Sequence, residues 1–463
     1  MFAVFAVFAV LAALFTGCSS SKSTSTTGGP NTSGAPTAGQ SSPSSNTKAD
    51  YGGGTNASGT DVGLTSTEIH VGVIADVNTP VAPGLFQQNV NLMKAWADLV
   101  NANGGLAGRK VVIDFCDSKL DANATTNCII QACAQDFALV GTAANVVTDI
   151  ADIDNCKNAQ GQAAGIPNLA FVGFPPLACD KNTYLITGQS SYCQTATQHP
   201  QTYTMNVGDV RYYKTQVPDL HGVWVYSSDV PTAKITLLPN YQAAVNLGVG
   251  KDGVGFYAEP GAAPQSALTP IIQAMKRDSS TFGYGGATSA QTVLLRREAQ
   301  LQNLTSVKVW ACNTGCYASS FLQQGGSAVN NEYVQIFTLP FYSEYQDNAT
   351  LNALVTKVGG VNNVSSNALG SFLQALLFQD AVRKAAATGT LNRQTLVTAL
   401  QSETSFDADG IIGATNIATQ TPSPCDVIVK VNNGQFERVY PTQKGTFDCN
   451  SANLATVKAD QTS

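Results

Sequence analysis

The chain has 463 residues, enough for two or three domains, and 43% of them are apolar while only 12% are charged. The formal net charge of -6 argues against a nucleic-acid binder, because such a protein needs a dense basic surface to neutralise phosphates. Three histidines leave little room for a His-based metal or acid–base site, so we expect no metal, no cofactor and no catalytic residues.

The N-terminus is typical of an exported protein. Residues 1–17 are continuously apolar and uncharged, too short a run to span a membrane but suited to an export signal. Phe15-Thr16-Gly17-Cys18 resembles a bacterial lipobox, in which the cysteine is lipidated, although Phe15 stands where Leu is usual and no basic residue precedes the run. We expect a lipoprotein signal peptide over 1–17 and lipidation of Cys18; the alternative is an ordinary secretory signal in which Cys18 is incidental.

A polar, low-complexity segment follows. Residues 18–63 consist mainly of Ser, Thr, Gly, Pro, Ala and Asn, a composition that cannot bury enough apolar surface to offset chain entropy. We therefore expect a disordered tether over 18–63, reaching roughly 35–40 Å from a lipid anchor.

The rest of the chain alternates between strand and helix patterns. Short β-branched runs predict strands at 69–75, 110–115, 137–141 and 168–173, with helices at 86–100, 125–135 and 149–159 between them. Residues 174–220 are less regular. The alternation then resumes, with strands at 221–226, 254–258, 281–284, 307–312 and 333–339 and helices at 232–246, 267–277, 289–301 and 317–323.

The last segments predict two helices, one with an apolar face from Leu369 to Leu377 and one at 391–402, and then a hairpin over 426–440 turned at Asn433-Gly434. Strand–helix–strand units at this spacing imply right-handed crossovers and parallel sheets. The sequence thus predicts an α/β fold of two doubly wound (flavodoxin-like) lobes, and small molecules commonly bind in a cleft between such lobes.

Several segments, in this order and spacing, are similar to the branched-chain amino acid (Leu/Ile/Val)-binding family of periplasmic binding proteins, type 1. The likeness covers about 67–450 and includes Glu68-Ile69-His70-Val71-Gly72-Val73, Asn101-Ala102-Asn103-Gly104-Gly105-Leu106-Ala107-Gly108-Arg109, Ala138-Leu139-Val140-Gly141, Phe406-Asp407-Ala408-Asp409-Gly410 and Asn433-Gly434-Gln435-Phe436. The resemblance implies two lobes joined by three crossovers, which close on a ligand by a hinge. It places the N-terminal lobe at 64–205 plus 341–405 and the C-terminal lobe at 206–340 plus 406–455.

The resemblance also implies where a ligand lies, in the loops that follow the strands. The residues carried over are Asn78, Thr79, Thr142, Ala143, Asn145 and Phe174 in the first lobe, and Ser228, Asp229, Tyr257, Gly286, Ala287 and Asn313 in the second. Two departures stand out. The first-lobe loops are poor in hydroxyls, and the loop 311–316 lacks the acid that pairs with an ammonium group. We therefore expect a neutral or weakly polar ligand in place of a free zwitterionic amino acid.

Eleven cysteines indicate an oxidising compartment, and setting Cys18 aside leaves an even number. Proximity in sequence predicts disulfides Cys179–Cys193, Cys312–Cys316 and Cys425–Cys449. Three pairings remain open for the other cysteines, and the expected ends of the strand and helices favour Cys116–Cys128 and Cys133–Cys156. A redox or zinc site at Cys312 and Cys316 is the alternative, but further ligands are scarce.

The resemblance implies a lipid-anchored, exported solute-binding protein that delivers a small molecule to the membrane permease of an ABC importer. We expect it to be monomeric. The alternative is a sensor subunit that reports the ligand to a signalling partner. An enzyme on this scaffold is disfavoured because no nucleophile–base–orienter set is found.

Overall fold

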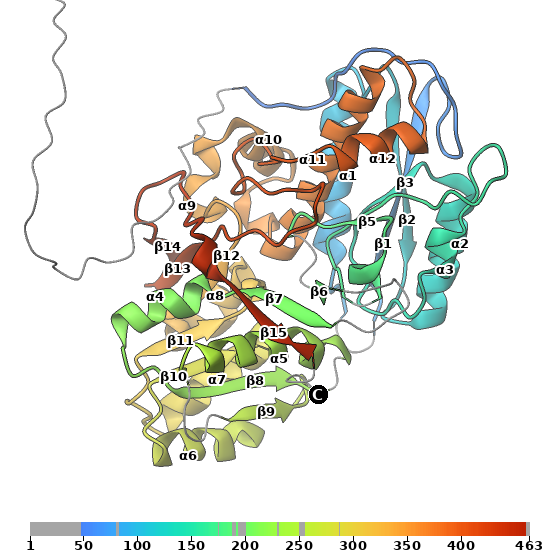
Figure 1. Cartoon of the computed structure of the whole chain (residues 1–463). Helices are drawn as coiled ribbons and strands as arrows, with labels where there is room; N and C mark the ends of the chain where they lie inside the picture. Colours follow the sequence, from blue (N-terminus) through green and yellow to red (C-terminus); the bar gives the residue numbers. More distant parts are fainter. Residues whose placement is uncertain are drawn as a thin grey trace, which may run out of the picture. The chain divides into compact units, whose positions relative to one another are not determined.

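The first lobe is built on a parallel sheet with strand order β2-β1-β3-β4-β5, the flavodoxin-like order (Figure 1). The structure is a computed structural model that describes residues 48–79, 83–174, 176–187, 191–192, 201–228, 231–249, 255–286 and 288–459. The strands of this sheet are β1 (Glu68–Ala75), β2 (Lys110–Asp117), β3 (Ala138–Thr142), β4 (Asn168–Ala170) and β5 (Thr183–Tyr184).

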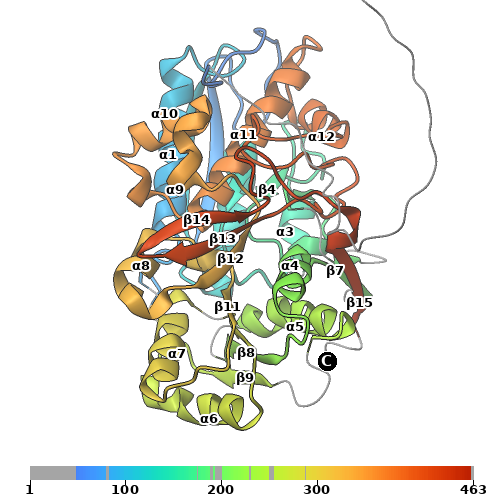
Figure 2. The same ribbon diagram turned by 90° about the vertical axis from the view of Figure 1, so that its left-hand side faces the viewer.

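Helices cover both faces of this sheet, and the alternation of side chains along β1 shows why. Val71 and Val73 share a core with α1 (Gln87–Ala102) and α11 (Ser366–Ala386), while Ile74 packs with α2 (Ala122–Gln135) on the opposite face. α11 is thus a first-lobe helix although it lies nearly 200 residues after this sheet in the sequence. The helix α12 (Arg393–Gln401) packs against α11, and α10 (Ala349–Lys357) packs against α1 (Figure 2).

The second lobe repeats the same topology and extends it. Its sheet has the order β14-β13-β12-β11-β10-β8-β9, with β9, β8, β10, β11 and β12 parallel and β13 and β14 antiparallel. The strands are β8 (Gly222–Ser227), β9 (Phe256–Glu259), β10 (Phe282–Gly285), β11 (Val309–Cys312), β12 (Glu332–Ile336), β13 (Val427–Asn432) and β14 (Gln435–Tyr440). The predicted hairpin over 426–440 is confirmed.

Alternation along β8 again assigns the helices to faces. Val223 and Val225 pack with α6 (Thr269–Arg277) and α7 (Ser289–Leu301), while Trp224 packs with α4 (Gly208–Gln216) and α5 (Pro231–Asn246). The remaining short helices are α3 (Ala151–Asp154), α8 (Ser319–Gly325) and α9 (Phe341–Glu344).

A small antiparallel sheet joins distant parts of the chain. β7 (Thr202–Asn206) pairs with β15 (Leu454–Lys458) and with β6 (Ser191–Tyr192), so the segment that enters the second lobe lies beside the C-terminal strand. A buried bidentate ion pair, Arg438 to Glu344 with oxygen–nitrogen distances of 2.7 and 2.8 Å, ties β14 to α9.

Doubly wound lobes were expected from the sequence, and the fold confirms them.

Residues 48–63, expected to belong to the tether, lie against the first lobe instead. Tyr51 is buried and donates a hydrogen bond to the carbonyl of Thr350, and Arg383 forms a bidentate ion pair with Asp50. Arg109 donates to the carbonyl of Ala57. The expected boundary at 63 is therefore wrong, because composition alone does not reveal backbone groups that side chains of the body bind. Residues 18–47 lie outside the described residues.

Predicted disulfides appear in the structure as Cys116–Cys128, Cys133–Cys156, Cys312–Cys316 and Cys425–Cys449. Cys18 and Cys193 lie outside the described residues, and so does the predicted Cys179–Cys193 pair. Within the described ranges, no helix is both long and apolar enough to cross a membrane.

Two expectations for local structure are wrong. The helix expected over 149–159 is only the four-residue α3, since the disulfide at Cys156 and a loop up to residue 165 hold the rest. The stretch 174–220, expected to be less regular and given no helix or strand, contains β7 and α4. These elements are short, and their stability comes from packing against β15 and the second-lobe core, a contribution that sequence periodicity does not display.

Candidate ligand-binding site

The predicted ligand residues of the first lobe lie together at the carboxyl edge of its sheet, where a buried carboxylate organises the loops. Asp76, directly after β1, accepts hydrogen bonds from the Ser118 hydroxyl at 2.6 Å, the Leu120 N–H at 2.7 Å and the Asn145 N–H at 2.8 Å. Ala143 is fully buried beside β1. The loops after β1, β2 and β3 are therefore held by one fully satisfied acid.

Other predicted first-lobe residues are also bonded within the lobe. The Thr142 hydroxyl lies 2.9 Å from Asn168 Oδ1 in a buried contact. Asn78 is exposed and donates its side-chain amide to Asp117 at 2.6 Å. Thr79 is buried, and Phe174 packs against the first-lobe core. These side chains shape the edge of the lobe, and most of their polar atoms already have protein partners.

The predicted second-lobe residues are more scattered. Ser228 is exposed and its N–H donates to the Glu259 carbonyl, while Tyr257 packs partly buried beside α6 and α7. Asn313 donates to the Gly286 carbonyl at 3.2 Å and lines a cavity. Asp229 and Ala287 lie outside the described residues. Asn313 is thus the one predicted residue, among those described, that borders this cavity.

The cavity has a volume of about 340 Å³ and is lined from both lobes. Its second-lobe walls come from β7 and the start of α4, from Trp224 on β8, and from the carboxyl ends of β10, β11 and β12. Leu373 of α11 and the segments 412–415 and 422–425 close it from the first lobe and the connecting chain. This is the edge at which ligands bind in open α/β sheets.

The walls are predominantly apolar. Met205, Val210, Trp224, Phe337 and Leu373 contribute hydrophobic surface, and Trp224 and Val210 are themselves almost completely buried. A cavity of this volume and lining suits a small molecule with a substantial hydrocarbon part.

A cluster of neutral amides forms one polar side of the cavity. Gln335 donates its side-chain amide both to Asn206 at 2.9 Å and to Asp426 at 2.6 Å, and Asn206 donates to the Ser423 carbonyl. Asp426 is buried behind this cluster, and burial raises its pKa well above the usual value. Its second oxygen, Oδ1, has no hydrogen-bond partner within the described structure.

Asp209 is the acidic side chain in the cavity wall. It lies in the first turn of α4, where the Val210 N–H donates to it at 2.7 Å. Burial raises its pKa to about 7, more than the hydrogen bond from Val210 lowers it. Near neutral pH this carboxyl can therefore donate a hydrogen bond as well as accept one.

The described lining contains no Lys, Arg or His. A bound carboxylate would have no countercharge there, and burying an unpaired charge is costly. The arrangement favours a neutral, largely apolar molecule with one or two polar groups directed at Asp209 and the amide cluster. Sequence reasoning missed Asp209, Asn206 and Gln335, because the first two lie in the stretch taken as irregular and none follows a predicted strand of the parallel sheets.

Comparison with protein-family profiles matches residues 68–206 to the family described as "Periplasmic binding protein". No curated protein sequence matches the chain significantly. The family match therefore covers the first-lobe sheet and the entry into the second lobe, and not the first-lobe helices α11 and α12.

Solved structures match over most of the chain. A fatty acid ABC transporter substrate-binding protein from Thermomonospora curvata has 16% identity and a TM-score of 0.64, covering 88% of this chain and 96% of its own. A branched chain amino acid ABC transporter from Thermus thermophilus with bound valine has 12% identity and a TM-score of 0.65, covering 84% and 98%. An ABC transporter substrate-binding protein from Aeropyrum pernix has 16% identity and a TM-score of 0.65, covering 83% and 97%. The chain thus has the periplasmic binding protein type I fold.

Proposed function

We propose that the chain is an extracytoplasmic solute-binding protein that captures a neutral, largely apolar small molecule and delivers it to the permease of an ABC importer. The fold supports this proposal, as do solved structures that share it: two are described as ABC transporter substrate-binding proteins and one as a branched chain amino acid ABC transporter with bound valine.

One observation carries the proposal: the cavity is lined by both lobes. Trp224 and Tyr284 come from the second-lobe sheet, and Leu373 comes from a helix packed on the first. A ligand that contacts both walls binds the closed arrangement of the lobes better than an open one, and this difference in affinity is what drives hinge closure.

The chemistry of the cavity supports the ligand class. Apolar side chains would take the hydrocarbon part of the ligand, and the amides of Asn206, Gln335 and Asn313 offer both donors and acceptors. Protonated Asp209 would donate to a carbonyl or hydroxyl oxygen. A zwitterionic amino acid fits poorly, since its carboxylate would face no cation in the described lining.

The N-terminal features support a location outside the cytoplasm. We propose that Cys18 carries a lipid that anchors the body to the membrane. The disulfides fit an oxidising compartment. The body would act as a monomer at the permease.

Native mass spectrometry of the purified protein, followed by titration of the molecule that co-purifies, tests the proposal. We expect one neutral small molecule per chain. Thr236→Trp should weaken its binding at least about 10-fold, because Thr236 is exposed and lines the cavity, so that an indole there fills part of the space.

Leu301→Trp is the matched control, since Leu301 is 70% exposed at the end of α7 and does not line the cavity. It should bind as the unmodified protein does. Equal affinity for both variants, or tight binding of free amino acids alone, would contradict the proposed site and ligand class.

A further inference from the structure

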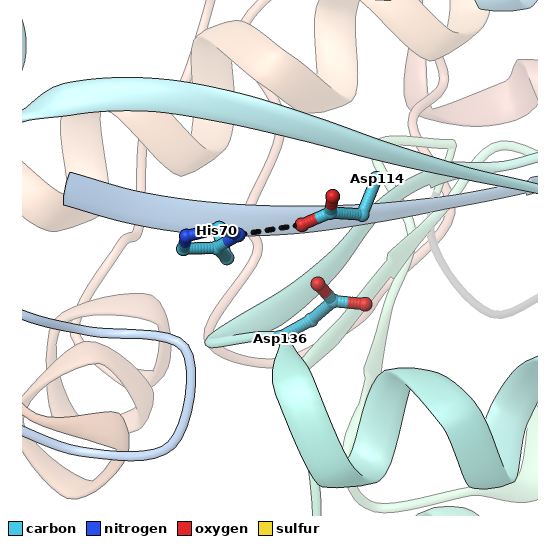
Figure 3. Close-up of side chains that lie close together, drawn as sticks. All are labelled: His70, Asp114 and Asp136. Atoms are coloured by element: carbon cyan, nitrogen blue, oxygen red, sulfur yellow. Dashed lines mark hydrogen bonds and ion pairs between the residues drawn. The ribbon is translucent and has the colours of Figure 1, made fainter.

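Three ligand-type side chains meet on the first-lobe sheet, away from the ligand cavity. His70 of β1, Asp114 of β2 and Asp136, just before β3, each offer one ligand atom, and these atoms lie within 4.8 Å of one another (Figure 3). His70 Nδ1 lies 2.7 Å from Asp114 Oδ2. None of the three residues lines the ligand cavity.

The strand geometry explains how these residues meet. His70, Gly72 and Ile74 share the α2-side face of β1, and Asp114 stands opposite Gly72 in the parallel register. A Cβ on Gly72 would lie 2.6 Å from Asp136 Oδ2, so only glycine leaves room for this carboxyl group. Glycine at position 72 therefore lets the carboxyl group of Asp136 lie beside that of Asp114.

Asp136 is an unusual group to leave in this position. Its side chain is 1% exposed and points into the cluster, and its Oδ1 has no hydrogen-bond partner among the described residues (Figure 3). A small cavity of about 10 Å³ is lined by both Asp114 and Asp136. The guanidinium of Arg393 donates a hydrogen bond to the backbone carbonyl of Asp136 and not to its carboxylate. A buried acceptor without a donor is costly unless something occupies the space.

The other two residues provide access from solvent. The side chains of His70 and Asp114 are each 31% exposed, and Glu68 Oε2 lies 3.6 Å from His70 Nε2. An ion can therefore reach the cluster without unfolding the sheet, and water can complete its coordination.

We propose that His70, Asp114 and Asp136 bind a divalent transition-metal ion, best matched by Zn²⁺, which ties β1, β2 and the start of β3 together. One imidazole nitrogen and two carboxylate oxygens form a ligand set that Zn²⁺ accepts, whereas Ca²⁺ and Mg²⁺ prefer oxygen alone. The ion would lie between His70 Nδ1 and Asp114 Oδ2 and would give Asp136 Oδ1 its missing partner. The site is structural and separate from ligand capture.

The test is calorimetric titration of ZnCl₂ into the full chain without a histidine tag, stripped with a chelator and held at pH 7.5. We expect one ion per chain. His70→Asn and Asp136→Asn should each weaken binding about 100-fold, the upper end of the range seen when even an outer-shell partner is lost. Co²⁺ should bind at the same stoichiometry and give a visible absorption spectrum that His70→Asn abolishes.

His221→Asn is the matched control. His221 also lies near an aspartate, with its Nδ1 3.6 Å from Asp219 Oδ2, but Asp219 is almost fully exposed, and the pair is not part of the three-residue cluster. This variant should bind Zn²⁺ as the unmodified chain does. Denaturation of each metal-free variant checks folding, and Asp136→Asn should fold, because the amide has the size and shape of the carboxyl group it replaces. Absence of stoichiometric binding, or equal affinity in His70→Asn and His221→Asn, would overturn the proposal.

Discussion

The two lobes have the same order of parallel strands, but the buried acids near their binding edges differ in how many hydrogen bonds they accept. In the first lobe, buried Asp76 accepts three hydrogen bonds from the loops that surround it. In the second, Asp209 lines the cavity and Asp426 is buried behind the amide cluster, and burial raises the pKa of each.

This difference separates two uses of a buried carboxyl group. Asp76 accepts hydrogen bonds from protein groups and so fixes the loops at the edge of the first lobe. Asp209 accepts one from the Val210 N–H and can form others with a ligand. Its burial lowers the stability of the folded protein when it is ionised. The second lobe would then supply most of the specific polar contacts, and the first lobe a preformed wall. The predictions below test this contrast, from the largest expected effect to the smallest.

Replacing the first-lobe acid should cost the most. Asp76→Ala leaves the Ser118 hydroxyl and the N–H groups of Leu120 and Asn145 without their acceptor, so we expect a loss of about 3–5 kcal/mol in the free energy of unfolding. Asp209→Asn should not lower it at pH 7, because a neutral amide replaces a carboxyl group whose ionised form is destabilised by burial. Urea denaturation measures both, and equal losses would remove the contrast.

The second-lobe acid should make stability depend on pH. The pKa of Asp209 is raised from 3.8 to about 7 by burial, so between these values the folded state holds a proton that the unfolded state has lost. Its stabilisation is complete below pH 3.8 and is lost as the pH rises through 7, a change of roughly 4 kcal/mol.

The measurement compares how steeply the free energy of unfolding changes with pH, between pH 4 and 8, in the unmodified protein and in Asp209→Asn. Asp209→Asn should flatten it, although Asp136 and Glu332, with pKa values raised to about 8 and 7 mainly by burial, still contribute. An unchanged slope in Asp209→Asn would show that this carboxyl is not protonated in the folded protein.

The disulfides should contribute according to the loops they close. Cys425–Cys449, beside the cavity, spans 24 residues and should stabilise by about 3 kcal/mol, against about 2 kcal/mol for Cys312–Cys316, which spans 4. Double serine variants, compared by urea denaturation under oxidising conditions, measure the two values. The reverse order would show that local packing outweighs loop closure.

Single amides should have the smallest effects and should distinguish the lobes directly. Asn313→Ala removes a group that lines the cavity and should weaken ligand binding about 5–10-fold, the value of one hydrogen bond. Asn78→Ala removes a side chain already bonded to Asp117 and should change affinity less than about 2-fold. Equal losses in titrations of the co-purified ligand would restore the first-lobe loops as direct binding elements.

Much of the fold could be predicted from the sequence because parallel strands carry a strong local signal. Runs such as residues 69–75 and 137–141 are mostly apolar, since both of their faces are covered. Disulfide pairs near in sequence could be predicted for a similar reason, since strand and helix ends fix where the cysteines lie. The binding of residues 48–63 to the body could not, because it depends on Arg109 and Arg383 reaching backbone carbonyls of a polar segment.

The site was less predictable. Placing the ligand at the strand ends led to Asn313. Asn206 ends β7, which pairs with the C-terminal strand β15, and Asp209 lies in the helix α4 that follows. The His70 cluster was not predicted, because the small number of histidines argued against a His-based metal site. Its partners Asp114 and Asp136 are brought to it by sheet register and by the space at Gly72, and neither is visible in local sequence.

A crystal structure of the protein with its co-purified molecule tests the central claim most directly. The account predicts ligand density between Trp224 and Leu373, with a polar atom of the ligand within hydrogen-bond distance of Asp209 or Asn313. Density held instead between Asn78 and Asn145 at the edge of the first lobe, with the cavity empty, would contradict it.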